Sequence, residues 1–191
     1  MKSNQIKTAL FLSFSALLFT FNACKSDDPK PADQPINEGE LITTLKVELT
    51  DSATGRVFNT AYFKDLDGEG GNPPTQFDTI KLNGNRTYFC KVTLLDESKT
   101  PSEDITEEVK EEAHEHLFVY ESSNQKIKVS ITDKDKNNLP LGIESKWQTM
   151  NNLDGKLKVI LKHQSNGIKN GSALLGETDI EVDFNVIQMD K

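Results

Sequence analysis

The sequence predicts a mainly β protein, an antiparallel β-sandwich of about nine strands with one short acidic helix. Apolar and polar residues alternate in short segments, most clearly over residues 180–186, where Ile, Val, Phe and Val alternate with acids and Asn. Such alternation is typical of strands with one buried face. Turn signals of the tight-hairpin kind, such as residues 83–85 and 154–155, separate the segments. One stretch breaks the strand pattern and has helical periodicity.

Nine segments carry the strand pattern, and most are bounded by residues that favour turns. They are 41–50, 57–64, 77–82, 86–95, 117–121, 126–132, 145–150, 156–163 and 177–188. Alternation in the fourth segment places Cys90 on the same face as Tyr88, Val92 and Leu94. We therefore expect Cys90 to be a small buried hydrophobe rather than a reactive thiol. Trp147 is the sole tryptophan, and we expect it to pack between the sheets rather than to form a sugar platform.

Residues 102–116 predict a helix of about three turns, because apolar residues recur at 105, 109 and 113. Ser102 is the expected cap, and the acids of the first turn favour the positive end of the helix dipole. His116 falls on the apolar face at the helix end. A helix this short needs that face docked on a sheet.

Residues 2–24 have the pattern of a secretory signal, with Lys2 and Lys7, a short apolar core, and Ala23 before Cys24. The core is about a dozen residues, whereas a membrane-spanning helix needs about 20; an uncleaved anchor helix is the alternative. A small residue followed by Cys resembles the bacterial lipobox, in which the Cys becomes a lipidated N-terminus carrying acyl chains such as palmitate. We therefore expect a signal peptide at 1–23, lipidated Cys24 with a flexible acidic tether at 24–40, and a β-sandwich domain at 41–191.

The charge balance excludes some classes of partner. Removing residues 1–23 takes away two lysines and no acids, so the formal net charge changes from −8 to −10. Nucleic acids need Lys and Arg to neutralise phosphate, so we expect no nucleic-acid partner. Membrane attachment would come from the lipid, because each buried CH₂ contributes about 0.8 kcal/mol.

Two loops are rich in oxygen ligands and are candidates for calcium binding. In each, ligand types fall at relative positions one, three and five, as at the start of a calcium loop. Neither loop is an EF-hand, because prolines interrupt both and no helices flank them. The alternative is ordinary turn chemistry, since Asp, Asn and Gly are common in turns for local reasons. The candidate ligands are Asp65, Asp67 and Glu69 in the first loop and Asp133, Asp135 and Asn137 in the second.

The histidines are His114, His116 and His163. On a helix, His114 and His116 would point about 200° apart and could not share a metal. His116 and His163 are candidates for binding a ligand or a metal, as in a zinc or haem site, although the sequence names no third ligand. The alternative is that His116 is a hydrogen-bonded packing residue.

Several motifs resemble a family of small outer-membrane lipoproteins of the Bacteroidetes. They are residues 65–72, 97–101, 103–106, 111–116, 132–135, 140–142, 161–164 and 176–180. Proteins of this family are often labelled as having a type 1 periplasmic binding fold, which implies a doubly wound α/β protein; the strand pattern contradicts that label. The start of the tether, residues 25–28, resembles the acidic export tag of lipoproteins displayed on the cell surface.

These observations predict a non-catalytic binding or accessory module, anchored by lipid at the outer membrane on its periplasmic or cell-surface face. The resemblance implies an outer-membrane transporter as a partner. A calcium-stabilised structural envelope protein and a hydrolase with an unrecognised site are the alternatives. The sequence contains no nucleophile elbow, phosphate loop or His-Glu-x-x-His motif, which favours a non-enzymatic role.

Overall fold

The computed structural model describes residues 41–68 and 70–189. The predicted signal peptide, the lipidation site Cys24 and the tether lie outside the described residues, as does Glu69 of the first acidic loop. The described residues belong to one compact unit. Across the described residues, no helix is long and apolar enough to span a bilayer.

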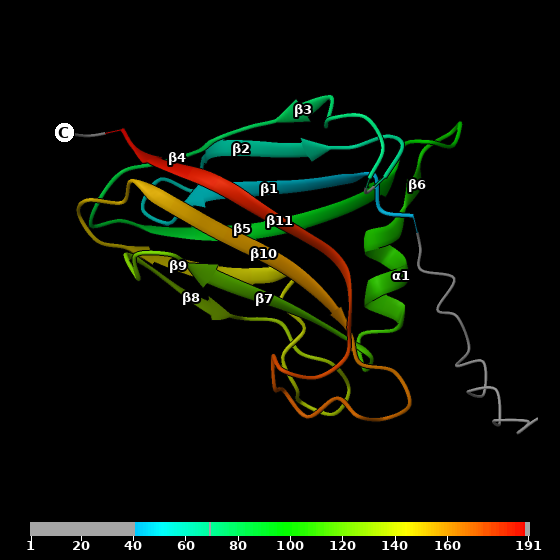
Figure 1. Cartoon of the computed structure of the whole chain (residues 1–191). Helices are drawn as coiled ribbons and strands as arrows, with labels where there is room; N and C mark the ends of the chain where they lie inside the picture. Colours follow the sequence, from blue (N-terminus) through cyan, green and yellow to red (C-terminus); the bar gives the residue numbers. More distant parts are fainter. Residues whose placement is uncertain (1–40, 69, 190–191) are drawn as a thin grey trace, which may run out of the picture. The chain divides into compact units, whose positions relative to one another are not determined.

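The described residues form eleven strands and one helix, arranged as two sheets (Figure 1). The larger sheet contains β1 (Thr44–Asp51), β2 (Val57–Lys64), β3 (Gln76–Phe77), β5 (Thr87–Asp96), β6 (Glu103–Asp104), β8 (Ile127–Ile131) and β9 (Glu144–Thr149). The smaller sheet contains β4 (Ile80–Leu82), β7 (His116–Ser122), β10 (Gly155–His163) and β11 (Glu177–Gln188). The helix α1 spans Ile105–Glu111. The predicted mainly β sandwich with one short helix is confirmed.

The strand order places β8 and β7 at edges of the two sheets. It is β3-β2-β1-β5-β9-β8 in the larger sheet, with β6 paired to β5, and β4-β11-β10-β7 in the smaller sheet. All pairs are antiparallel except β11 with β4. The turns at 83–85 and 150–154 join strands of different sheets, so the expectation that these turn signals close tight hairpins is wrong.

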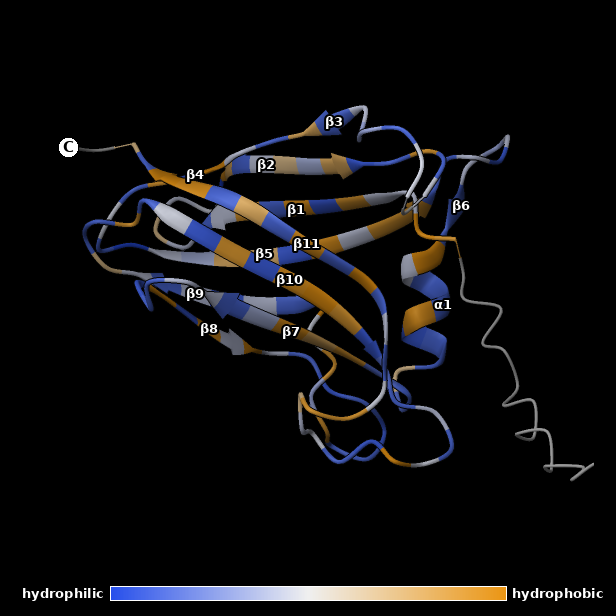
Figure 2. Cartoon of the chain, in the orientation of Figure 1, coloured by the Kyte–Doolittle hydropathy of each residue, from blue (hydrophilic) through white to orange (hydrophobic). Residues whose placement is uncertain are grey.

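The core lies between the sheets and is built from alternate residues of their strands, as the alternating colours along the strands indicate (Figure 2). On β5, Tyr88, Cys90, Val92 and Leu94 are all buried, as predicted. The prediction that Cys90 is a small buried residue is confirmed, and burial raises the pKa of its thiol, which disfavours the reactive thiolate. Trp147 is fully buried and donates a 2.8 Å hydrogen bond from Nε1 to Ser145 Oγ, so it is not a surface platform.

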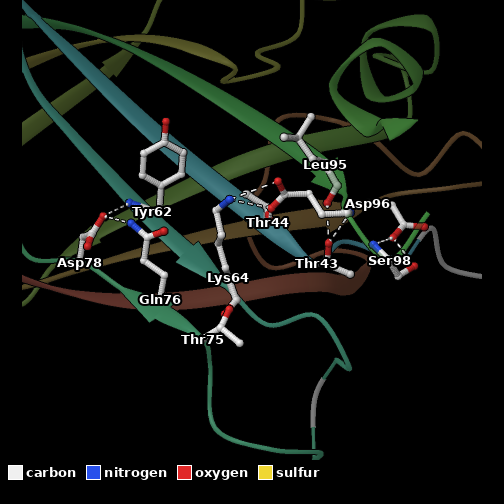
Figure 3. Close-up of polar contacts among 11 residues, drawn as sticks. Thr43, Thr44, Tyr62, Lys64, Thr75, Gln76, Asp78, Leu95, Asp96 and Ser98 are labelled. Carbon is white, nitrogen blue, oxygen red and sulfur yellow. Dashed lines mark hydrogen bonds and ion pairs between the residues drawn. The ribbon is translucent and has the colours of Figure 1, made fainter. Parts of the chain in front are cut away.

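The segment predicted as one strand at 77–82 is split between the two sheets. Asp78 interrupts it, because its carboxylate accepts hydrogen bonds from Tyr62 N at 3.0 Å and from Gln76 Nε2 at 2.8 Å (Figure 3). These bonds hold β3 against β2, and the chain then crosses to pair β4 with β11.

The helix is shorter than predicted. It has seven residues and is capped by Asp104, whose side chain accepts from Thr106 N, and not by Ser102. Thr106 Oγ1 accepts from Leu94 N at 2.9 Å and donates to Leu94 O at 3.1 Å, which fastens the helix to β5. His116 is not in the helix but begins β7, so the prediction of a helix reaching residue 116 is wrong.

Polar contacts also fix the ends of β1, β2 and β5 (Figure 3). Thr43 Oγ1 donates to Leu95 O at 3.2 Å and accepts from Glu97 N at 2.7 Å. Lys64 Nζ lies 2.9 Å from Glu97 Oε2, so an ion pair joins β2 to the residue that follows β5. One network of hydrogen bonds and an ion pair therefore joins the start of β1 to the ends of β2 and β5, next to the start of the described domain.

A buried lysine ties together three segments at the ends of β7 and β10. Lys169 Nζ lies 3.0 Å from Asp135 Oδ2 and donates a 2.7 Å hydrogen bond to the carbonyl of Ala113. The side chains of Lys169 and Asp135 are 1% and 0% exposed. Gln164 is also buried and donates to the carbonyls of Ser172 and Leu175, which folds the loop that carries Lys169. The buried ammonium of Lys169 thus links the end of the helix and the loop that carries Asp135 to the loop that carries Lys169.

We predict that Asp135→Asn lowers the free energy of unfolding by about 3–5 kcal/mol, because the Lys169 ammonium would remain buried without a counter-charge. Chemical denaturation with a spectroscopic readout measures the change. Asp183→Asn is the matched control: it breaks the exposed 2.9 Å pair with Lys156 and should cost less than about 1 kcal/mol. Equal losses in the two variants would contradict this account of the ion pair.

Candidate functional site

The candidate site lies where β7 begins, β10 ends and α1 stops. In the antiparallel pairing of β7 with β10, His116 is directly opposite His163. Side chains directly opposite each other on paired strands project to the same face with Cβ atoms about 4.5–5.5 Å apart. The sequence singled out these two histidines, and the strand register brings them together.

The two imidazole rings stack, with centroids 4.8 Å apart and planes inclined by 22°. Rings stacked face to face do not point their nitrogens at each other along a line, as the two axial ligands of a haem must. The arrangement instead presents nitrogens side by side. This geometry suits ligands of a single small ion better than ligands on opposite faces of a macrocycle.

His116 is held in one orientation by the end of the helix. Its Nδ1 lies 3.2 Å from the carbonyl oxygen of Glu112, the helix C-cap residue. A carbonyl only accepts, so Nδ1 carries the proton and Nε2 keeps its electron pair in the neutral ring. Burial, followed by the charge of His163, lowers the pKa of His116 to about 4. The ring is therefore neutral at physiological pH.

Carboxylates surround the histidine pair. Asp179 Oδ2 lies 3.8 Å from His116 Nε2, and Glu115 Oε2 lies 3.4 Å from His163 Nε2. Burial raises the pKa of Asp179 from 3.8 to about 6. Glu112 offers a third carboxylate, and one of its oxygens and one nitrogen from each of His116 and His163 lie within 4.8 Å of one another. His114 stands apart from this group, beside Glu115.

Sequence reasoning missed Glu112, Glu115 and Asp179 as neighbours of the histidines. Glu112 and Glu115 are close in sequence to His116. The predicted helix continued through these residues, so it gave no indication of the turn that brings them beside the histidines. Asp179 approaches because β11 pairs with β10. Only the tertiary pairing of distant strands could have identified it.

The second acidic loop uses its carboxylates for its own backbone. Asp135 Oδ1 accepts from Asn137 N at 2.8 Å and Leu139 N at 2.9 Å. Burial opposes ionisation of Asp135, but Lys169 and these amides outweigh it, so the pKa of Asp135 is lowered. Asp133 accepts from the backbone of Gly142 and Glu144, while Asn137 is exposed. These contacts match the turn chemistry that was the alternative to calcium binding.

The first acidic loop differs. Asp67 Oδ2 accepts from the backbone and the side chain of Asn72, at 2.9 Å and 2.6 Å, and these bonds lower its pKa. Burial, followed by a hydrogen bond with Asp67, raises the pKa of Asp65. Asp65 Oδ1 is buried and finds no hydrogen-bond partner within the described part of the chain. The third candidate, Glu69, lies outside that part.

An apolar groove runs along the edge strands β7 and β8, which lie side by side in Figure 1. It has a volume of about 180 Å³ and is lined by residues 117–120 of β7, by Val129 and Ile131 of β8, and by Pro140, Gly171 and Ala173 of the two loops. Pockets that enclose whole small molecules measure roughly 300–1,000 Å³. The groove is large enough for one apolar group of a larger ligand.

We predict that Asp179→Asn raises the melting temperature relative to the parent protein more at pH 7.5 than at pH 4.5. The folded-state pKa of about 6 exceeds the usual 3.8, so the folded protein holds this proton more tightly than the unfolded chain does. Stability from Asp179 is therefore present below about pH 4 and is lost as pH rises to about 6. Asparagine stays neutral at every pH, so the variant does not lose stability as the pH rises.

The melting-temperature difference between the variant and the parent protein should be roughly 2–5 °C larger at pH 7.5 than at pH 4.5. Thermal melts with chelator present measure it. A difference that stays constant from pH 4.5 to 7.5 would contradict the buried position of Asp179.

No family model, no curated protein and no solved structure matches this chain. The resemblance to the Bacteroidetes lipoproteins therefore rests on its sequence motifs, and any function must be argued from the residues themselves.

Proposed function

We propose that this protein is a lipid-anchored cell-envelope protein that acts as a non-catalytic binding or accessory module at the outer membrane. The observation that carries this proposal is the segment from Lys2 to Cys24, with its basic start, its short apolar core and its terminal small residue and Cys. Acyl chains on Cys24 would hold the domain at the membrane, and residues 25–40 would allow it to reach a partner.

The folded domain is consistent with a binding role. The groove beside β7 and β8 is concave and mostly apolar, and such surfaces favour capture of a ligand over a purely structural role. Membrane attachment would raise the local concentration of the module near a neighbouring membrane protein, for which an outer-membrane transporter is the proposed partner. Binding would be non-covalent.

We predict that Cys24→Ser releases the protein from the membrane fraction and abolishes its labelling by radioactive palmitate, because the acyl chains have no other attachment point. Cell fractionation and metabolic labelling measure both effects. Cys90→Ser is the matched control, because Cys90 is buried and is the other cysteine of the chain. Membrane retention of the Cys24 variant would refute the lipid anchor.

A second candidate is an envelope protein stabilised structurally by calcium, which the unpartnered oxygen of Asp65 favours. A hard cation would accept this oxygen and that of Asp67 as ligands and remove their mutual repulsion. In that case calcium raises the melting temperature of the parent protein by several degrees over chelator, and Asp65→Asn removes the increase. The Asp183→Asn variant should retain it. Identical melts of the parent protein in calcium and in chelator would eliminate this candidate.

A further inference from the structure

Three residues from three separate elements converge beside the helix end. Glu112 is the C-cap of α1, His116 is the first residue of β7 and His163 is the last residue of β10. Each contributes one potential ligand atom, and these atoms lie within 4.8 Å of one another. In a tetrahedral site with bonds of about 2.0–2.2 Å, ligand atoms are roughly 3.3–3.6 Å apart. A shift of about 1 Å would therefore close the group around an ion.

The side chain of Glu112 is free to make that shift. Glu112 is exposed, whereas His116 is only 3% exposed and His163 is partly buried. The histidines therefore form the fixed part of the group, and the glutamate closes it from the solvent side. The exposed glutamate also marks the route by which an ion would enter.

His116 is already in the form that a metal requires. Metal-bound histidines usually donate their other ring N–H to a carbonyl or carboxylate, which fixes the tautomer and the ring orientation. The contact between His116 Nδ1 and the Glu112 carbonyl is of this kind. It leaves the electron pair of Nε2 available to a metal.

The charges around the group favour a cation. Glu115 lies 3.4 Å from His163, Asp179 lies 3.8 Å from His116, and Glu177 pairs with His163 across β10 and β11. The nearby positive charges are Lys162, whose Nζ donates to Thr178 Oγ1 at 2.8 Å, and Lys169, which is held by Asp135 and by the carbonyl of Ala113. Both ammonium groups are therefore directed at other partners.

We propose that Glu112, His116 and His163 bind a divalent transition-metal ion of the zinc class. Two imidazoles select borderline-soft ions over calcium and magnesium, which prefer oxygen ligands. Three protein ligands leave a fourth position for water or for a donor atom of a partner. This site is separate from the lipid anchor and from the first acidic loop, so its test is independent of both.

The test is a calorimetric titration of zinc chloride into the purified full-length protein after treatment with EDTA. The expected result is saturable binding of one zinc ion per chain. Glu112→Gln should weaken zinc binding by roughly ten-fold or more. Glu112 is exposed, so the substitution should leave the fold intact. Glu111→Gln is the matched control, since it removes the same charge from the adjacent exposed residue.

The histidines provide the second arm. His163→Gln should abolish the binding, while His114→Gln should leave it unchanged because His114 lies outside the group. Circular dichroism of each variant, with zinc and with EDTA, checks that the sheets remain folded. Equal affinities of the Glu111 and Glu112 variants, or loss of binding in the His114 variant, would overturn the proposal, as would the absence of zinc binding by the parent protein.

Discussion

The pairing of β7 with β10 is the constraint on which the candidate site depends. It places His116 opposite His163 and orders the chain so that α1 ends directly beside them. A shift of the register by one residue would turn every side chain of β7 to the opposite face. It would take Phe118 and Tyr120 out of the hydrophobic core and separate the histidines. The hydrophobic core therefore enforces the register, and the register in turn positions the polar group.

Burial of charge limits how this end of the sandwich can be built. Burial raises the free energy of a charged side chain, and the buried titratable groups of this structure respond either by pairing with an opposite charge or by shifting toward the neutral form. Lys169 and Asp135 remain ionised because they pair with each other. His116 avoids charge by staying neutral, and Asp179 shifts toward its protonated form. A cation between the histidines would stabilise the ionised form of the nearby carboxylates, which connects the electrostatics of this group with the proposed metal.

The strands and the buried faces could be predicted from the sequence because alternation reports directly on burial, as for Tyr88, Cys90 and Val92. Boundaries set by tertiary contacts could not be predicted. Asp78 splits a predicted strand by bonding to β2, and the turn after Glu112 shortens the predicted helix. The sequence also identified His116 and His163 as candidates, but their stacking follows from the pairing of two strands whose histidines are 47 residues apart in the sequence. Glu112 could be recognised as a third ligand only after that pairing was known.

The most direct measurement is an anomalous difference map at the zinc absorption edge, from crystals of the full-length protein grown with zinc. The account predicts one strong peak at about 2.0–2.1 Å from a nitrogen of His116 and a nitrogen of His163, with the Glu112 carboxylate moved inward to complete the group. A peak at other residues, with the two histidine rings still stacked and unliganded, would contradict it.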